Sequence, residues 1–151
     1  MGFTQLSIKG RALRYLAARE HSRLELARKL APHEEHPGEI EAALDELQAK
    51  GYLSEERVAA SLVHRRAARL GTSRLKQELQ GKGLSAELVA RTVGELRETE
   101  HQRALDAWRR KFGEPAATPQ ERAKQMRFLA GRGFAPEVIR RIVQGKFDDE
   151  E

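Results

Sequence analysis

The sequence GYLSEERVAASLVHRRAARLGTSRLKQELQGKGL, residues 51–84, decides the fold. It begins with a glycine that an apolar residue follows, and it ends in the same way. A helix commonly stops in this pattern, with a left-handed cap that returns the chain to the core. Ser54 precedes two glutamates, which predicts a helix start because a cap oxygen and negative charge favour a helix N-terminus. Apolar residues recur at helical spacing as far as Leu70, Gly71 ends that pattern, and Ser73 begins a second short helix.

Basic side chains lie along these two helices and reappear in a later helix. Since they cluster on one side, we predict that they contact a negatively charged partner. A solvated helical surface often has the same appearance, so the pattern alone leaves binding and solubility equally open. The candidate contact residues are Arg57, Arg65, Arg69, Arg74, Lys76 and Lys82, followed by Arg109, Arg110 and Lys111.

The composition predicts an all-α protein. Leucine and alanine occur 18 and 21 times, whereas the β-branched isoleucine and valine occur only 4 and 6 times. Helix formers in this excess argue against a substantial sheet. A chain of 151 residues suits one domain or a few small helical units that share cores.

An internal repeat divides the chain. Residues 79–84, LQGKGL, match residues 129–134, LAGRGF, at an offset of 50. A period of this length indicates tandem helical units that complete one another's cores. We expect three tandem three-helix units at residues 1–53, 54–97 and 98–147 and an acidic tail at 148–151, together forming an elongated, curved monomer.

The individual helices follow from caps, stops and apolar spacing. A serine with a glutamate three residues later, as in Ser22–Glu25, is a capping box, and Thr118–Glu121 repeats it with proline at the first helical position. The predicted helices in the first unit cover residues 8–19, about 22–31 and 37–50. Those of the second cover 55–70, 73–82 and 85–96, and those of the third run from about 98 to 112, 119 to 130 and 136 to 143.

Charge and cysteine content limit the cellular setting. The formal charge is +5 although the last four residues are all acidic, so the rest of the chain is basic and suited to a polyanion or an acidic protein groove. The absence of cysteine fits an intracellular chain. No apolar run at the amino terminus is long enough for a signal peptide or a membrane span, so we expect a cytoplasmic protein without membrane contact.

No catalytic or cofactor site emerges from the sequence. His33 and His36 are three residues apart in a segment between two prolines, whereas paired zinc ligands on a helix lie four apart. His21, His64 and His101 are scattered beside polar residues and are interpreted as surface or cap residues. The glycines mark helix ends rather than a phosphate loop. We therefore expect no enzyme activity and no cofactor.

Four aromatic residues leave two interpretations. They alternate with arginines, as in proteins that stack single-stranded bases, but their spacing places them with leucine and alanine on the inward side of their helices. We favour a core role for them. They are Trp108, Phe112, Phe128 and Phe134.

The order of these segments resembles the RecX family of regulators of the RecA recombinase. The resemblance begins with GYLSEERVA, continues through Arg65 and Gly71 to RLKQELQGKGL, and extends to RALRYLAAREHSRLELARKL before it and to WRRKFGEP and RFLAGRGF after it. It implies a non-enzymatic protein that binds in the groove of the RecA filament. Such a protein bridges neighbouring subunits and suppresses ATP hydrolysis, strand exchange and coprotease activity. By the same likeness Arg65, Gly71, Lys82 and Gly83 belong to the family signature.

Two other functions stay open at this stage. One is a helical module that binds single- or double-stranded DNA directly and competes with the recombinase; it would bind naked DNA with strong salt dependence. The other is a helical scaffold for a different partner. The acidic tail is expected to be disordered and to screen the basic face.

Overall fold

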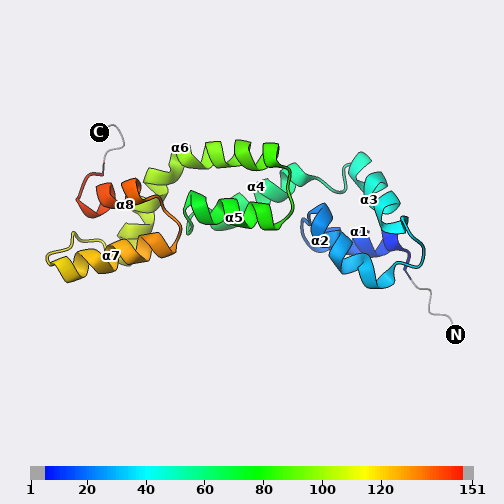
Figure 1. Cartoon of the computed structure of the whole chain (residues 1–151), viewed down its shortest axis with the longest axis horizontal. Helices are drawn as coiled ribbons and strands as arrows, with labels where there is room; N and C mark the ends of the chain where they lie inside the picture. Colours follow the sequence, from blue (N-terminus) through cyan, green and yellow to red (C-terminus); the bar gives the residue numbers. More distant parts are fainter. Residues whose placement is uncertain (1–5, 148–151) are drawn as a thin grey trace. The chain divides into compact units, whose positions relative to one another are not determined.

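The computed structural model describes residues 6–147, so the predicted acidic tail lies outside the described residues. Within that range all regular structure is helical, as predicted, and no residue is assigned to a strand (Figure 1). None of the described helices is long and apolar enough to span a membrane. The α-helices are α1 (Ile8–Ala18), α2 (Arg23–Leu30), α3 (Glu39–Ala49), α4 (Glu55–Arg66), α5 (Thr72–Gly81), α6 (Ala86–Lys111), α7 (Pro119–Gly131) and α8 (Pro136–Val143), with a short 3₁₀ turn η1 (Ala31–His33) after α2.

The contacts between residues divide the chain into two compact units. Unit 1 contains the residues up to Ser61 together with Gly81–Leu84, and unit 2 contains Leu62–Gln80 and the residues from Ser85 onward. The division passes through α4, so that helix contributes to both units.

Unit 1 is a three-helix core. Ser22 and Glu25 form the predicted capping box at the start of α2, with both reciprocal hydrogen bonds present. The Arg23 guanidinium fixes α2 to α3 through Glu41 and Asp45, at 2.8 and 2.7 Å. The buried apolar side chains are Ile8, Ala12, Leu26, Leu30, Ile40, Leu44, Leu47 and Leu53.

Unit 2 is organised by α6. The sequence pattern predicts a helix that ends at Leu96 and another that begins near Glu98, which is wrong: α6 runs unbroken for 26 residues. No glycine, proline or cap separates the two predicted helices, and Gly94 within α6 costs only about 1 kcal/mol relative to alanine. One side of α6 packs on Leu70 and Leu75, and its later turns pack on α7 and α8 around Trp108, as predicted for a core residue.

Helix α4 also departs from the expected range. It ends at Arg66 rather than Leu70, because the following carbonyl groups of Ala67 and Leu70 accept hydrogen bonds from Arg103 instead of continuing the helix. Gly51 and Gly83 end their helices in the left-handed conformation, with φ of +83° and +75°. Gly71 does not have a positive φ, so it is not a left-handed helix stop.

Gly71 serves instead at a close crossing of two chain segments. Its N–H donates to the carbonyl of Arg132 at 2.8 Å, and its Cα faces the backbone of Gly133 so closely that a Cβ would overlap the Gly133 carbonyl and the Phe134 nitrogen. Gly133 has φ of +90° and packs against the side chain of Arg74. The crossing fixes the start of α5 against the end of α7.

Two histidines are not where the sequence placed them. His64 is exposed, but His21 and His101 are buried at 1% and 6% exposure, so a surface position is wrong for these two. His21 does contact a helix cap, since Arg19 is the C-cap residue of α1. The two ring nitrogens of His21 lie 3.0 Å from the Arg19 carbonyl and 2.9 Å from the Lys29 ammonium. A neutral ring that donates to the carbonyl and accepts from the ammonium satisfies both contacts.

We predict that Gly71→Ala destabilises the protein. The added methyl group would clash with backbone atoms, which cannot move aside as a flexible side chain can. The free energy of unfolding, measured by urea denaturation, should therefore fall by about 1–3 kcal/mol. Gly94→Ala is the matched control: no atom lies within 4 Å of its Cβ position, and the substitution should raise stability by about 0.5–1 kcal/mol. Equal effects of the two substitutions would contradict the crossing.

We predict that unit 1 loses stability in mild acid through His21. Burial lowers the pKa of His21, and the positive charges of Arg19 and Lys29 add to this, while the hydrogen bond to the Arg19 carbonyl opposes it. The unfolded chain then binds the proton more readily, so stability should decrease as the pH falls below about 6.5. Thermal unfolding is measured from about pH 7.5 to about pH 5, the range in which histidine titrates. The unfolding temperature should depend less on pH in His21→Gln than in the unchanged protein. An identical dependence would exclude His21 as its source.

Candidate cationic interaction surface

The Glu100 carboxylate fixes the frame of the candidate site. It is buried at 5% exposure, and its two oxygens accept the backbone N–H groups of Thr72 and Ala135 at 2.8 and 2.9 Å. These groups lie at the N-termini of α5 and α8, where a negative charge is favourable because the helix dipole is positive there. One side chain of α6 therefore sets the position of both helices.

Arg103, one turn further along α6, fixes the turn between α4 and α5. Its guanidinium donates to the carbonyls of Ala67, Leu70 and Leu96 and to the Thr72 hydroxyl, the last two at 2.9 and 3.1 Å. Burial lowers the pKa of this guanidinium, and the neighbouring Glu100 charge opposes that shift. Arg103 is thus committed inside unit 2 and holds the turn that carries Arg69.

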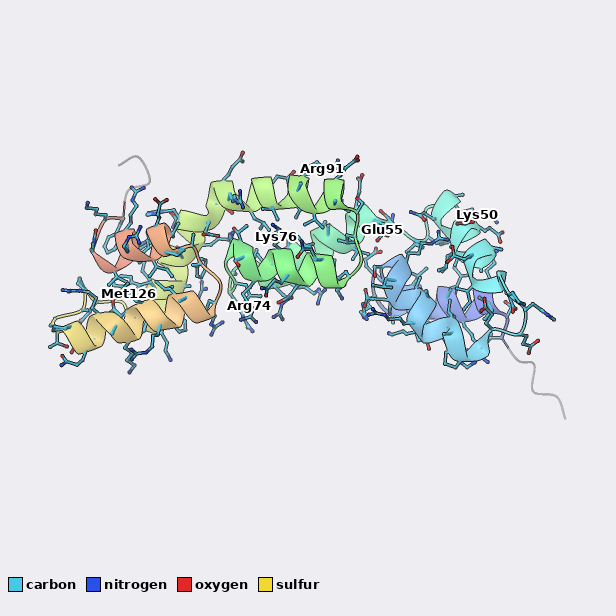
Figure 2. The ribbon with its side chains drawn as sticks, viewed as in Figure 1. Lys50, Glu55, Arg74, Lys76, Arg91 and Met126 are labelled. Carbon is cyan, nitrogen blue, oxygen red and sulfur yellow. The ribbon has the colours of Figure 1, made fainter. Side chains whose placement is uncertain are left out.

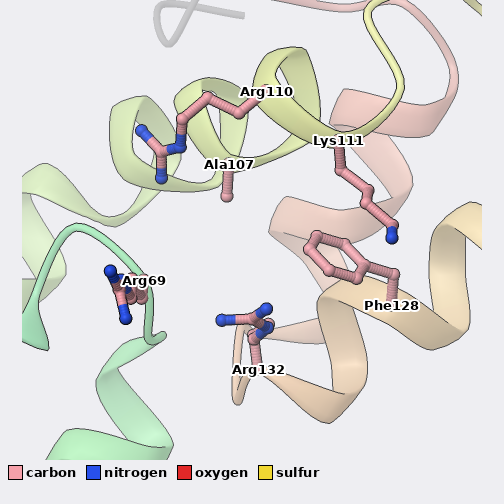
Figure 3. Close-up of a pocket in the computed structure, with 6 residues that line it drawn as sticks. All are labelled: Arg69, Ala107, Arg110, Lys111, Phe128 and Arg132. Atoms are coloured by element: carbon pink, nitrogen blue, oxygen red, sulfur yellow. The ribbon is translucent and has the colours of Figure 1, made fainter.

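A cationic pocket lies between this turn, α6 and α7, and we call it the Phe128 pocket. It has a volume of about 280 Å³. Figure 3 shows that its arginines come from three separate elements and surround a common space, with Phe128 and Lys111 at one side. None of its lining residues is acidic, so it is suited to an anion. The lining residues are Arg69, Ala107, Arg110, Lys111, Phe128 and Arg132.

Uncharged groups position the cations of the Phe128 pocket. The Arg132 guanidinium lies 5.0 Å from the centre of the Phe128 ring, and the Lys111 ammonium lies 5.7 Å from it. Arg110 donates to the Ala68 carbonyl at 2.6 Å. Phe128 itself packs edge-on against Phe112, with ring centres 5.5 Å apart. The aromatic ring supports cations by its quadrupole, and carbonyl dipoles do the same without neutralising their charge.

A second cationic pocket adjoins the first and is called the Arg74 pocket. Its volume is about 290 Å³, and it shares the side chains of Arg69 and Arg132 with the Phe128 pocket. Arg74 donates to the Gly131 carbonyl at 2.9 Å, and Arg66 pairs with Glu78 at 2.6 Å. The other lining residues are Arg65, Leu70 and Gly131.

Unit 2 thus brings five of the predicted contact residues together and separates two others from them. Lys76 is two residues from Arg74 on α5 and projects from a different face of that helix (Figure 2). It lines a separate pocket together with Arg97. Arg109 lies 5.7 Å from the centre of the Phe147 ring. The residues gathered in the two cationic pockets are Arg65, Arg69, Arg74, Arg110 and Lys111.

The remaining predicted contact residues belong to unit 1 and make ion pairs within it. Arg57 pairs with Glu20 at 2.9 Å and also donates to the Gly51 carbonyl. Lys82 lies 3.3 Å from Glu25. The pKa of Glu25 falls to about 2 although burial opposes this, because the Ser22 N–H, Arg19 and Lys82 all stabilise its charged form. Their role in binding a partner stays a prediction.

Two pocket residues, Arg66 and Arg132, are not among the contact residues predicted from the sequence. Arg132 occupies the same place in GRG as Lys82 in GKG, so the 50-residue repeat already contained the signal for it. Arg66 directly follows Arg65 in the sequence, and no sequence pattern marks it as a pocket residue. The described residues contain no group of three or more His, Asp or Glu side chains arranged to hold a metal ion.

These observations define a class of protein: a tandem array of three-helix domains with cationic pockets in unit 2. Comparison with known proteins places the chain within that class. Residues 9–47, 54–93 and 98–143 match the first, second and third three-helix domains of RecX. The chain belongs to the RecX family.

Individual relatives support this assignment over nearly the whole chain. "Regulatory protein RecX" of Leptothrix cholodnii is 58% identical over 140 residues, which are 93% of this chain and 89% of the relative. The protein of the same name from Ralstonia nicotianae is 51% identical over 93% of this chain and 88% of its own length. The crystal structure of RecX from Lactobacillus salivarius shares the fold with a TM-score of 0.76 at 18% identity, covering 92% of this chain and 94% of that one.

We predict that Glu100→Gln destabilises unit 2. An amide has one acceptor oxygen, so its NH₂ group would face one of the two backbone N–H donors and leave it unsatisfied. The free energy of unfolding should fall by about 1–3 kcal/mol, measured by urea denaturation. Glu98→Gln removes an exposed carboxylate from the same helix and should have little effect. Equal losses in the two variants would show that Glu100 does not fix α5 and α8.

Proposed function

We propose that this protein regulates the RecA recombinase by binding its nucleoprotein filament and inhibiting ATP hydrolysis, strand exchange and coprotease activity. Family membership supports a regulator, since the relatives carry the name regulatory protein RecX. The observation that carries the proposal is the convergence of Arg65, Arg69, Arg110 and Arg132 on one side of unit 2. A surface of this kind attracts and orients an acidic or phosphate-bearing assembly.

The fixed arrangement of the arginine-bearing turns in unit 2 suits inhibition by binding alone, without a catalysed reaction. Glu100, Arg103 and the Gly71–Gly133 crossing hold the arginine-bearing turns in fixed positions, so little conformational entropy is lost when they contact a partner. A protein that contacts neighbouring filament subunits opposes the movement between them that ATP turnover requires. Several weak contacts then add through high effective concentration. On this proposal the protein acts as a monomer in the cytoplasm, where recombinase and DNA are found, and has no reaction of its own.

A second candidate function is direct binding to DNA in competition with the recombinase. The two cationic pockets favour it, because arginine binds phosphate in a bidentate manner. Base stacking is less well supported, since Trp108 and Phe134 are buried and Phe128 packs with cations and Phe112. Fluorescence anisotropy with labelled oligonucleotides separates the two functions. Tight binding to naked DNA that weakens steeply with salt supports competition, whereas binding only in the presence of RecA supports the filament.

We predict that Arg65→Glu combined with Arg69→Glu weakens inhibition of the RecA ATPase. Reversing two charges on this surface should raise the concentration needed for half-inhibition about tenfold or more, which corresponds to about 1.4 kcal/mol. Arg122→Glu combined with Arg127→Glu changes the net charge equally at exposed positions of α7 that line neither pocket. That control should inhibit nearly as well as the unchanged protein. Inhibition that persists in the Arg65/Arg69 variant would exclude this surface as the contact.

A further inference from the structure

The Phe128 pocket and the Arg74 pocket form one cationic depression. Arg69 and Arg132 line both of them, so the two spaces adjoin across these side chains. Among residues 6–147, no aspartate or glutamate lines either pocket. The combined depression therefore offers positively charged groups on several sides. Ala107, Phe128 and Leu70 contribute apolar surface to it.

Four cations of this depression keep their charge available for a ligand. Within residues 6–147, none of the ion pairs with a carboxylate involves Arg69, Arg110, Lys111 or Arg132. Backbone carbonyls position Arg110 and Arg74, and the Phe128 ring supports Arg132 and Lys111. Like charges brought together repel one another. A multivalent anion would remove this repulsion, so the depression is suited to a ligand with several adjacent negative charges.

We propose that this depression is a binding site for a condensed phosphate chain, such as the triphosphate of a nucleotide or inorganic tripolyphosphate. Guanidinium groups match phosphate oxygens in a bidentate manner, and adjacent phosphates carry charge more densely than the carboxylates of a peptide. Among residues 6–147, Phe128 is the one aromatic residue that lines the depression, and its ring already contacts Arg132, Lys111 and Phe112. The site therefore recognises the phosphate chain and not the nucleoside.

This inference goes beyond the proposed function and does not require it. The site lies within one chain, so it is tested with the purified protein in the absence of RecA. Because Arg69 also belongs to the proposed filament surface, a bound phosphate chain would compete with the filament for that side chain.

Isothermal titration calorimetry with sodium tripolyphosphate tests the site, first at low ionic strength and then at about 0.15 M salt. The unchanged protein should bind with a one-to-one stoichiometry. Arg69→Gln combined with Arg132→Gln should weaken binding about tenfold or more. Arg122→Gln combined with Arg127→Gln, which removes the same charge from exposed positions of α7 outside both pockets, should change it less than about twofold. Equal losses in both variants would overturn the site in favour of general charge attraction.

Four further ligands show which chemical group the site recognises. ATP should bind about as tightly as tripolyphosphate, and AMP much more weakly, if the phosphate chain is what the site recognises. Binding of a single-stranded oligonucleotide or an acidic peptide without binding of tripolyphosphate would overturn the proposal. Thermal unfolding of the Arg69/Arg132 variant checks its fold. If that variant is unfolded, Arg69→Gln alone takes its place, because no side-chain hydrogen bond or ion pair within residues 6–147 involves Arg69.

Discussion

The buried carboxylate of Glu100 is the interaction on which unit 2 depends. It joins the N-termini of α5 and α8 through two backbone hydrogen bonds, and both helices would otherwise begin with unsatisfied donors. The Gly71–Gly133 crossing and the Arg103 guanidinium also hold the turn between α4 and α5 in place. Together they fix the turns that carry Arg69 and Arg132. The arrangement of the cationic pockets thus depends on the contacts of Glu100, Arg103 and the Gly71–Gly133 crossing, in addition to those that the pocket cations make themselves.

The described part of the chain uses its basic residues in two ways. Arg103, Arg57 and Lys82 are engaged with carbonyls or carboxylates inside their own units, where they stabilise the fold. Arg69 and Arg132 line both pockets, and the aromatic ring of Phe128 rather than a carboxylate supports Arg132. Sequence alone treats these residues as equivalent surface charges. Their difference arises from tertiary contacts, and it determines which of them remain available to a partner.

Much of the fold follows from the sequence, because its signals are local. A few neighbouring residues are enough to identify a capping box such as Ser22–Glu25, or a glycine that ends a helix, such as Gly51 and Gly83. The continuity of α6 was missed because apolar spacing alone does not show whether two helical patterns join. The role of Gly71 was also missed, since it depends on a segment that lies more than 60 residues away. Five of the predicted contact residues meet in the pockets. Arg132 could have been predicted as a sixth, because it matches the predicted contact residue Lys82 across the 50-residue repeat.

The central claim is that the arginine-bearing side of unit 2 contacts the recombinase filament. Hydrogen–deuterium exchange of the protein, with and without RecA assembled on single-stranded DNA, tests this most directly because it locates contacts without altering any residue. If the filament binds this side of unit 2, exchange should slow in the turn after α4, in the last turns of α6 and at the end of α7 when the filament is present. Protection confined to α1, α2 and α3, or none at all, would contradict it.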